Sequence, residues 1–229
     1  MKSKDKFIQV SCDGGAATGK STGAKMISKK YNLKFLSSGL LYRYASYLIL
    51  KFKPKNELIF LKKKFVSLNY SRLNKINLHS PIISEHSAVI ARKGEIRKIL
   101  KSYQTNFAKK NKNCCIEGRD ISTKILPHSD VKFFFKCDLN IAARRRYKDL
   151  KRVNSKIKFR EVKKALRIRN ILDIKRKNSP LLKHNDSISI DTGKLNKKAM
   201  LNKMSKYLDK AIKLKYVNWT RDKKAKFIT

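Results

Sequence analysis

Short apolar runs alternate with longer stretches of helical apolar spacing along this 229-residue chain. The apolar runs at residues 7–10, 33–36, 114–116, 131–135 and 187–191 have the length and density of buried strands. Apolar residues recur with helical spacing at residues 40–50, 84–109, 139–150, 160–175 and 195–215. Strands that alternate with helices predict a three-layer α/β fold, here with a mainly parallel five-stranded sheet.

The pattern weakens between residues 51 and 77, a polar and lysine-rich stretch. Its short apolar pieces suggest small strands or a helix in a peripheral insert, and the sequence leaves both open. The next predicted helix, residues 84–109, is expected to break near Gly94, because glycine weakens a helix interior.

A glycine loop follows the first predicted strand and leads into a helix. Residues 14–21 read G-x-x-x-x-G-K-S, which in a strand-loop-helix context predicts a phosphate-binding loop. Lys20 can reach the β- and γ-phosphates of a nucleotide, and the hydroxyl of Ser21 can bind Mg²⁺. The predicted ATP-binding residues are Gly14, Gly15, Ala16, Ala17, Thr18, Gly19, Lys20, Ser21 and Thr22. The alternative is a strand-turn-helix with accidental glycines.

Composition narrows the class of protein further. Hydrophobic residues make up 41% of the chain, enough for a core, and no stretch is long and uncharged enough for a membrane span or a secretory signal. We therefore expect a cytoplasmic protein. The four cysteines, Cys12, Cys114, Cys115 and Cys137, lack C-x-x-C spacing, so neither a zinc site nor a redox pair is expected.

The formal net charge of +42 invites a nucleic-acid hypothesis. However, the lysines are spread along the whole chain rather than gathered in one segment. This distribution is typical of a compositional bias with a solvated surface that attracts anionic substrates. No specific nucleic acid is therefore expected as a partner.

Three further groups of polar residues lie where predicted strands or helices end. Ser38 and Arg43 lie at the start of a helix, although an exposed helical arginine is often simply solvated. Arg119 and Asp120 follow a strand, where they can bind a ligand or close a turn as a pair. Arg169, Asp173 and Arg176 share one helical face, which also fits a solvated ion pair. Of Arg144, Arg145 and Arg146, at most two can face one ligand.

Taken in order, these motifs resemble those of bacterial cytidylate kinases, which are nucleoside monophosphate kinases. The match runs from about residue 7 to residue 208 and includes S-G-x-x-Y-R at residues 38–43, E-G-R-D-I-x-T at 117–123 and R-x-x-x-D-x-x-R-x-x-S-P-L at 169–181. The resemblance implies transfer of the γ-phosphoryl group of ATP to CMP or dCMP with Mg²⁺. Its implied catalytic residues are Lys20, Arg119 and Arg176. We expect a monomer.

The resemblance also implies an acceptor site. Residues that match Arg43, Arg119 and Arg176 bind the acceptor phosphate, with Ser38 beside them. Residues that match Arg97 and Asp120 recognise the cytosine base. Those that match Arg169 and Asp173 contact the pentose. A carboxylate suits cytosine because it accepts a hydrogen bond from the N4 amino group.

The chain departs from the family pattern at three positions. Ala88 stands where the family has a base-recognising serine, Asn170 replaces an aspartate, and Glu117 stands where aspartate is frequent. A different acceptor, such as UMP or AMP, therefore remains an alternative, as does a basic nucleic-acid-binding protein on a kinase scaffold.

The resemblance also suggests how one kinase domain, residues 1–229, is divided. The core comprises residues 6–52 and 84–215, a shortened monophosphate-binding insert occupies 53–83, and a short lid lies at about 148–159. Residues 216–229 form a basic tail.

Overall fold

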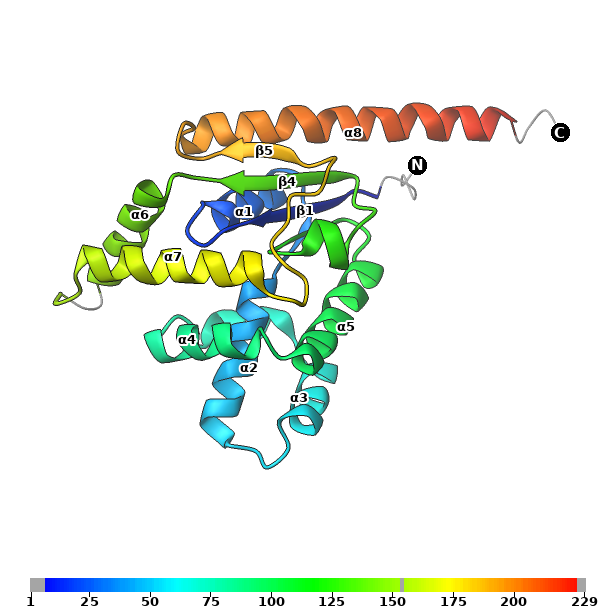
Figure 1. Cartoon of the computed structure of the whole chain (residues 1–229). Helices are drawn as coiled ribbons and strands as arrows, with labels where there is room; N and C mark the ends of the chain where they lie inside the picture. The colour runs from blue at the N-terminus through cyan, green and yellow to red at the C-terminus, as the bar shows by residue number, and fades with distance from the viewer. Residues whose placement is uncertain (1–6, 153–154, 226–229) are drawn as a thin grey trace.

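A five-stranded parallel sheet forms the centre of the computed structural model, which describes residues 7–152 and 155–225 (Figure 1). The strands lie in the order β2-β3-β1-β4-β5, and every neighbouring pair is parallel. Their bounds are β1 Gln9–Gly14, β2 Lys34–Ser37, β3 Cys114–Gly118, β4 Val131–Lys136 and β5 Ile188–Asp191. The predicted fold class is confirmed, and the carboxyl ends of all five strands share one edge.

Helices cover both faces of this sheet. α1 (Lys20–Lys30) and α8 (Lys197–Ala225) join one apolar core, in which Ile27 and Met204 pack with Phe133 and Phe135 of β4. α2 (Ser38–Phe52) and α5 (Gly94–Lys110) join a second core around Ile116 of β3. Strands buried on both faces explain the continuous apolar runs in the sequence.

The weakly patterned segment is helical. It contains α3 (Glu57–Val66) and the 3₁₀-helix η1 (Tyr70–Lys75), and α4 (Pro81–Ile90) follows. The side chain of Asn56 caps α3 by accepting hydrogen bonds from two backbone N–H groups, and α3 buries Leu61 and Phe65, four residues apart, in the core around β3. Of the two alternatives for residues 51–77, the helix is correct. The predicted break near Gly94 is confirmed, since α5 begins there.

The lid predicted at about 148–159 includes the last turn of α6 (Leu139–Lys151) and reaches the first residue of the neighbouring α7 (Phe159–Lys175), and its residues 153–154 lie outside the described part of the chain. In the view of Figure 1, α7 lies below the sheet and runs from the side of α6 toward α2 and α5. α8 continues ten residues past the predicted helix end at 215, to Ala225, so most of the expected tail is helical. Residues 226–229 lie outside the described part of the chain. The division into core, insert, lid and tail stays a prediction.

Candidate active site

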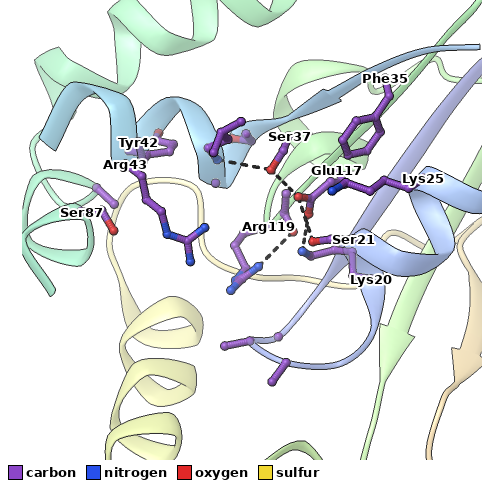
Figure 2. A pocket seen from close by; sticks show the side chains of 18 of the residues that line it. Lys20, Ser21, Lys25, Phe35, Ser37, Tyr42, Arg43, Ser87, Glu117 and Arg119 are labelled. Atoms are coloured by element: carbon purple, nitrogen blue, oxygen red, sulfur yellow. Dashed lines mark hydrogen bonds and ion pairs between the residues drawn. The ribbon is translucent and has the colours of Figure 1, made fainter. Parts of the chain in front are cut away.

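A cavity of about 860 Å³ opens where β1, β2 and β3 end. Figure 2 shows side chains from the glycine loop, α1, α2 and the end of β3 pointing into it. All eight residues predicted to bind the acceptor line this cavity: Ser38, Arg43, Arg97, Arg119, Asp120, Arg169, Asp173 and Arg176. From the predicted ATP-binding set, Gly15, Ala16, Ala17, Lys20 and Ser21 also line it. The structure therefore brings the distant motifs together.

The glycine loop has the backbone that its sequence predicts. Gly19 has φ +77° and Gly14 has φ +154°, and Ala17 also has a positive φ of 57°. A Cβ atom on Gly14 would lie 2.5 Å from the carbonyl oxygen of Phe135, a contact that real Cβ atoms do not make. Gly14 is therefore required both for its conformation and for its closeness to β4.

Lys20, at the start of α1, forms a buried ion pair with Glu117 at the end of β3. The same carboxylate accepts hydrogen bonds from the hydroxyls of Ser21, at 3.0 Å, and Ser37. Burial alone would raise the pKa of Glu117, but the charge of Lys20 and hydrogen bonds from Lys20 and Ser37 outweigh it and lower the pKa to about 2. Glu117 is therefore ionised beside the residues predicted to bind triphosphate and metal.

Asp13 fixes the turn that carries Arg119 and Asp120. Its buried carboxylate accepts hydrogen bonds from the backbone N–H groups of Ile121 and Ser122, at 2.8 and 2.7 Å, and from the Ser122 hydroxyl at 2.6 Å. These donors begin the π-helix η2 (Ile121–Ile125). Asp13 thereby ties the end of β1 to the segment after β3.

The part of the cavity that holds several of the predicted acceptor-binding residues is built from ion pairs. Arg97 of α5 donates to Asp120, and Arg176 lies 3.9 Å from the other oxygen of that carboxylate. Asp173 of α7 accepts from Nε of Arg119 at 2.7 Å and lies 3.4 Å from Arg176. Arg97, Arg119 and Arg176 are thus oriented by carboxylates rather than solvated.

Another part of the cavity is lined by arginines that form no ion pair with a carboxylate of the described residues. Arg43, Arg146 and Arg169 line it, and within the described residues none of them forms an ion pair. Nε of Arg43 is buried without a hydrogen-bond partner. Burial, and repulsion by Arg119, Arg43 and Arg146, lower the pKa of Arg169 to about 10 although Asp173 opposes the shift. An anion bound here would relieve this repulsion.

Several contacts could not be predicted from sequence spacing. Arg146 faces the cavity, whereas Arg145 donates to the hydroxyl and carbonyl of Thr192, at 2.9 and 2.7 Å. Neither the Glu117 ion pair with Lys20 nor the place of His79 in the cavity lining was predicted. The acidic residue directly after the predicted strand at 114–116, before Gly118, was the available signal for Glu117.

Comparison with known proteins agrees with this geometry. The family profile for cytidylate kinases matches residues 10–210. The chain belongs to the cytidylate kinase family. It is 33% identical over 223 residues to a cytidylate kinase of Mesomycoplasma hyopneumoniae, covering 90% of this chain and 96% of that protein. A cytidylate kinase of Clostridium tetani is 33% identical over 217 residues, covering 90% and 95%.

As a member of the cytidylate kinase family, the protein is a nucleoside monophosphate kinase. Solved structures support the fold. An uncharacterized protein from Eubacterium ventriosum aligns with a TM-score of 0.53 at 17% identity, covering 90% of this chain and 99% of that one. Shikimate kinase from Bacteroides thetaiotaomicron aligns with a TM-score of 0.51 at 11% identity, covering 89% and 99%. Among the helices described here, none has both the length and the apolar character needed to cross a membrane.

Proposed function

We propose that this kinase transfers the γ-phosphoryl group of ATP to CMP or dCMP, with Mg²⁺. The observation that carries the proposal is the cavity itself. It holds the glycine loop at one side and, at the other, a buried Arg97–Asp120 pair beside three cavity-lining arginines without ion pairs in the described structure. A donor site thus faces an acceptor site across one volume, as direct transfer between two bound nucleotides requires.

The donor side fits a triphosphate. The loop precedes the N-terminus of α1, where unpaired backbone N–H groups and the helix dipole favour anions. Ser21 and Glu117 contribute two oxygens 3.0 Å apart, a hydroxyl and an ionised carboxylate, of the hard type that Mg²⁺ prefers. Bound Mg²⁺ would neutralise charge on the phosphates. Lys20 would leave Glu117 to contact the β- and γ-phosphates.

The acceptor side fits a cytidine monophosphate. Asp120 would accept from the cytosine N4 amino group while Arg97 holds that carboxylate in place. Arg43, Arg119 and Arg176 would bind the acceptor phosphate, with Ser38 nearby, and Arg169 and Asp173 would contact the pentose.

These residues mainly position and neutralise, because phosphoryl transfer needs little covalent participation by the protein. The acceptor phosphate is already an anion, so no general base is required. Arg119, Arg176 and Lys20 would stabilise charge that spreads over the transferring group. Arg146, on the lid side of the cavity, is placed to add a fourth cation.

Ala88 affects which base the proposed acceptor site can recognise. It lines the cavity with Ser87, whose hydroxyl donates to the carbonyl of Ser84 at 2.7 Å within α4. A hydroxyl committed to its own helix can still accept a hydrogen bond from a base but has no proton to donate. Such a hydroxyl could accept from the N3–H group of uracil but could not donate to N3 of cytosine. UMP is therefore the second candidate acceptor.

A nucleotide-panel assay tests the proposal. Purified protein with ATP and Mg²⁺ is offered CMP, dCMP, UMP and AMP, and ADP release is measured for each. We expect the highest kcat/KM with CMP or dCMP. Equal values for all four acceptors would contradict cytosine recognition, and a preference for AMP would contradict the role given to Asp120.

A further inference from the structure

Asn170 on α7 contacts the glycine loop directly. Its side-chain oxygen Oδ1 accepts a hydrogen bond from the backbone N–H of Ala16 at 3.1 Å. The same oxygen lies so close to Gly15 that a Cβ atom there would be 3.2 Å from it. Since Ala16 offers a donor, the amide must present its oxygen to the loop and its NH₂ group elsewhere.

Asp173, three residues further along α7, contacts the proposed acceptor side. Asp173 accepts from Arg119 at 2.7 Å and from Arg176 at 3.4 Å. Burial would raise the pKa of Asp173, but the charge and hydrogen bond of Arg119, with Arg169 and Arg176, lower it. Residues 170 and 173 are neighbours on the helix surface, so a single turn of helix contacts both the donor loop and two acceptor arginines.

The other end of the loop is held separately. The carbonyl of Thr18 accepts from the Thr192 hydroxyl at 2.8 Å, and Arg145 in turn donates to Thr192. The hydroxyl of Thr18 also donates to the carbonyl of Gly15 at 3.1 Å. Among the described hydrogen bonds, that of Asn170 joins the first half of the loop to α7, and Ala16 also belongs to the apolar cluster that includes Leu166 of α7.

We propose that Asn170 is a positioning residue that couples the acceptor site to the donor loop through α7. The proposal rests on the function proposed above, in that Arg119 and Asp173 meet the acceptor. A bound acceptor that fixes these two residues also fixes the helix turn bearing Asn170. That turn then holds the Ala16 amide in one orientation, so less freedom is lost when the triphosphate binds. By linkage, the triphosphate must favour acceptor binding by the same factor.

Two substitutions separate the hydrogen bond from the shape of the side chain. Asn170→Leu keeps the branching of the side chain at Cγ but removes the acceptor oxygen, whereas Asn170→Asp keeps an acceptor oxygen. Asn140→Leu, at an exposed position on α6, serves as the matched control. The dissociation constant of a non-hydrolysable ATP analogue is measured for each protein, without and with the monophosphate that the panel assay selects as best acceptor.

We expect the acceptor to tighten analogue binding to the unaltered protein, and Asn170→Leu to reduce that tightening by about 3- to 10-fold, the effect of one lost hydrogen bond. Asn170→Asp and Asn140→Leu should retain it. Equal tightening in the Asn170→Leu variant, or none in the unaltered protein, would overturn the proposal. The dissociation constant is measured without turnover and with the acceptor that the panel assay selects. If the proposed cytosine preference is wrong, this result is therefore unaffected.

Discussion

Lys20 and Glu117 form an ion pair whose side chains are only 8% and 4% exposed, and each belongs to a different motif of the sequence. Glu117 also binds Ser21 and Ser37, so one carboxylate joins the start of α1 to the start of α2. The predicted phosphate-binding loop and α2 therefore meet at this residue. When no nucleotide is bound, the buried charge of each of these two side chains is balanced by the other.

Removal of the Lys20 ammonium should abolish most of the activity. We expect Lys20→Ala to lower kcat by about 100- to 1000-fold, the usual effect of losing one donor to the transition state. ADP release with the preferred acceptor measures this. Lys98→Ala, an exposed lysine on α5, should leave kcat unchanged.

The same substitution tests the ion pair. Lys20→Ala leaves Glu117 buried and unpaired, which should lower the free energy of unfolding by about 3–5 kcal/mol in urea titrations. The double variant Lys20→Ala/Glu117→Gln should regain much of that stability but no activity. Recovery of activity in the double variant would contradict the role of Lys20.

Asp120 should determine the preference for cytosine. Asp120→Asn replaces one carboxylate oxygen with an NH₂ group that cannot accept from the cytosine amino group. We expect the ratio of kcat/KM for CMP to that for UMP to fall by about 5- to 150-fold, as for loss of a good base contact. Glu95→Gln, on the exposed surface of α5, is the control. An unchanged ratio would mean that the base is read elsewhere.

His79 should make acceptor binding depend on pH. It lines the cavity, and burial together with Arg43 of α2, Arg146 of α6 and Lys25 of α1 lowers its pKa from the ordinary value of 6.5. The free protein therefore holds it neutral at pH 7. An anionic phosphate bound among those cations would raise the pKa again, so binding takes up a proton and strengthens as the pH falls through the raised value.

Calorimetry in two buffers of different ionisation enthalpy measures this proton uptake. CMP itself also titrates near this pH, so the comparison is with His79→Gln under identical conditions. We expect the unaltered protein to take up more protons than the variant at pH 6.5. Equal uptake by both proteins would mean that His79 does not meet the bound phosphate.

Asp13 should be needed for stability and for the placement of Arg119. In the unaltered protein the Asp13 carboxylate accepts from the backbone N–H groups of Ile121 and Ser122. Asp13→Asn replaces one of these oxygens with an NH₂ group that cannot accept, so at least one buried N–H is left unpaired. We expect the free energy of unfolding to fall by about 1–3 kcal/mol and KM for the acceptor to rise. Urea unfolding and steady-state kinetics measure the two effects. A loss of stability with unchanged KM would restrict Asp13 to a structural role.

The sequence was sufficient for the strands, the backbone of the glycine loop and the broken helix at Gly94, because these depend on local signals. Apolar density marks a buried strand, the G-x-x-x-x-G-K-S spacing requires a particular backbone, and glycine interrupts a helix. The insert was ambiguous for the opposite reason. Its helices depend on packing of Leu61 and Phe65 against the rest of the chain, and short polar segments carry little pattern of their own.

Resemblance, rather than spacing, predicted the acceptor-binding residues, and the structure brings all of these predicted residues to one cavity. Only the tertiary structure decided the ion pairs: Asp173 with Arg119 and Asp120 with Arg97 within this set, and Glu117 with Lys20 outside it. It also decided that Arg146 rather than Arg145 faces the cavity and that Asn170 holds the loop. These partners lie between 23 and 154 residues apart, and such distances are closed by the packing of the sheet and helices, which no local pattern encodes.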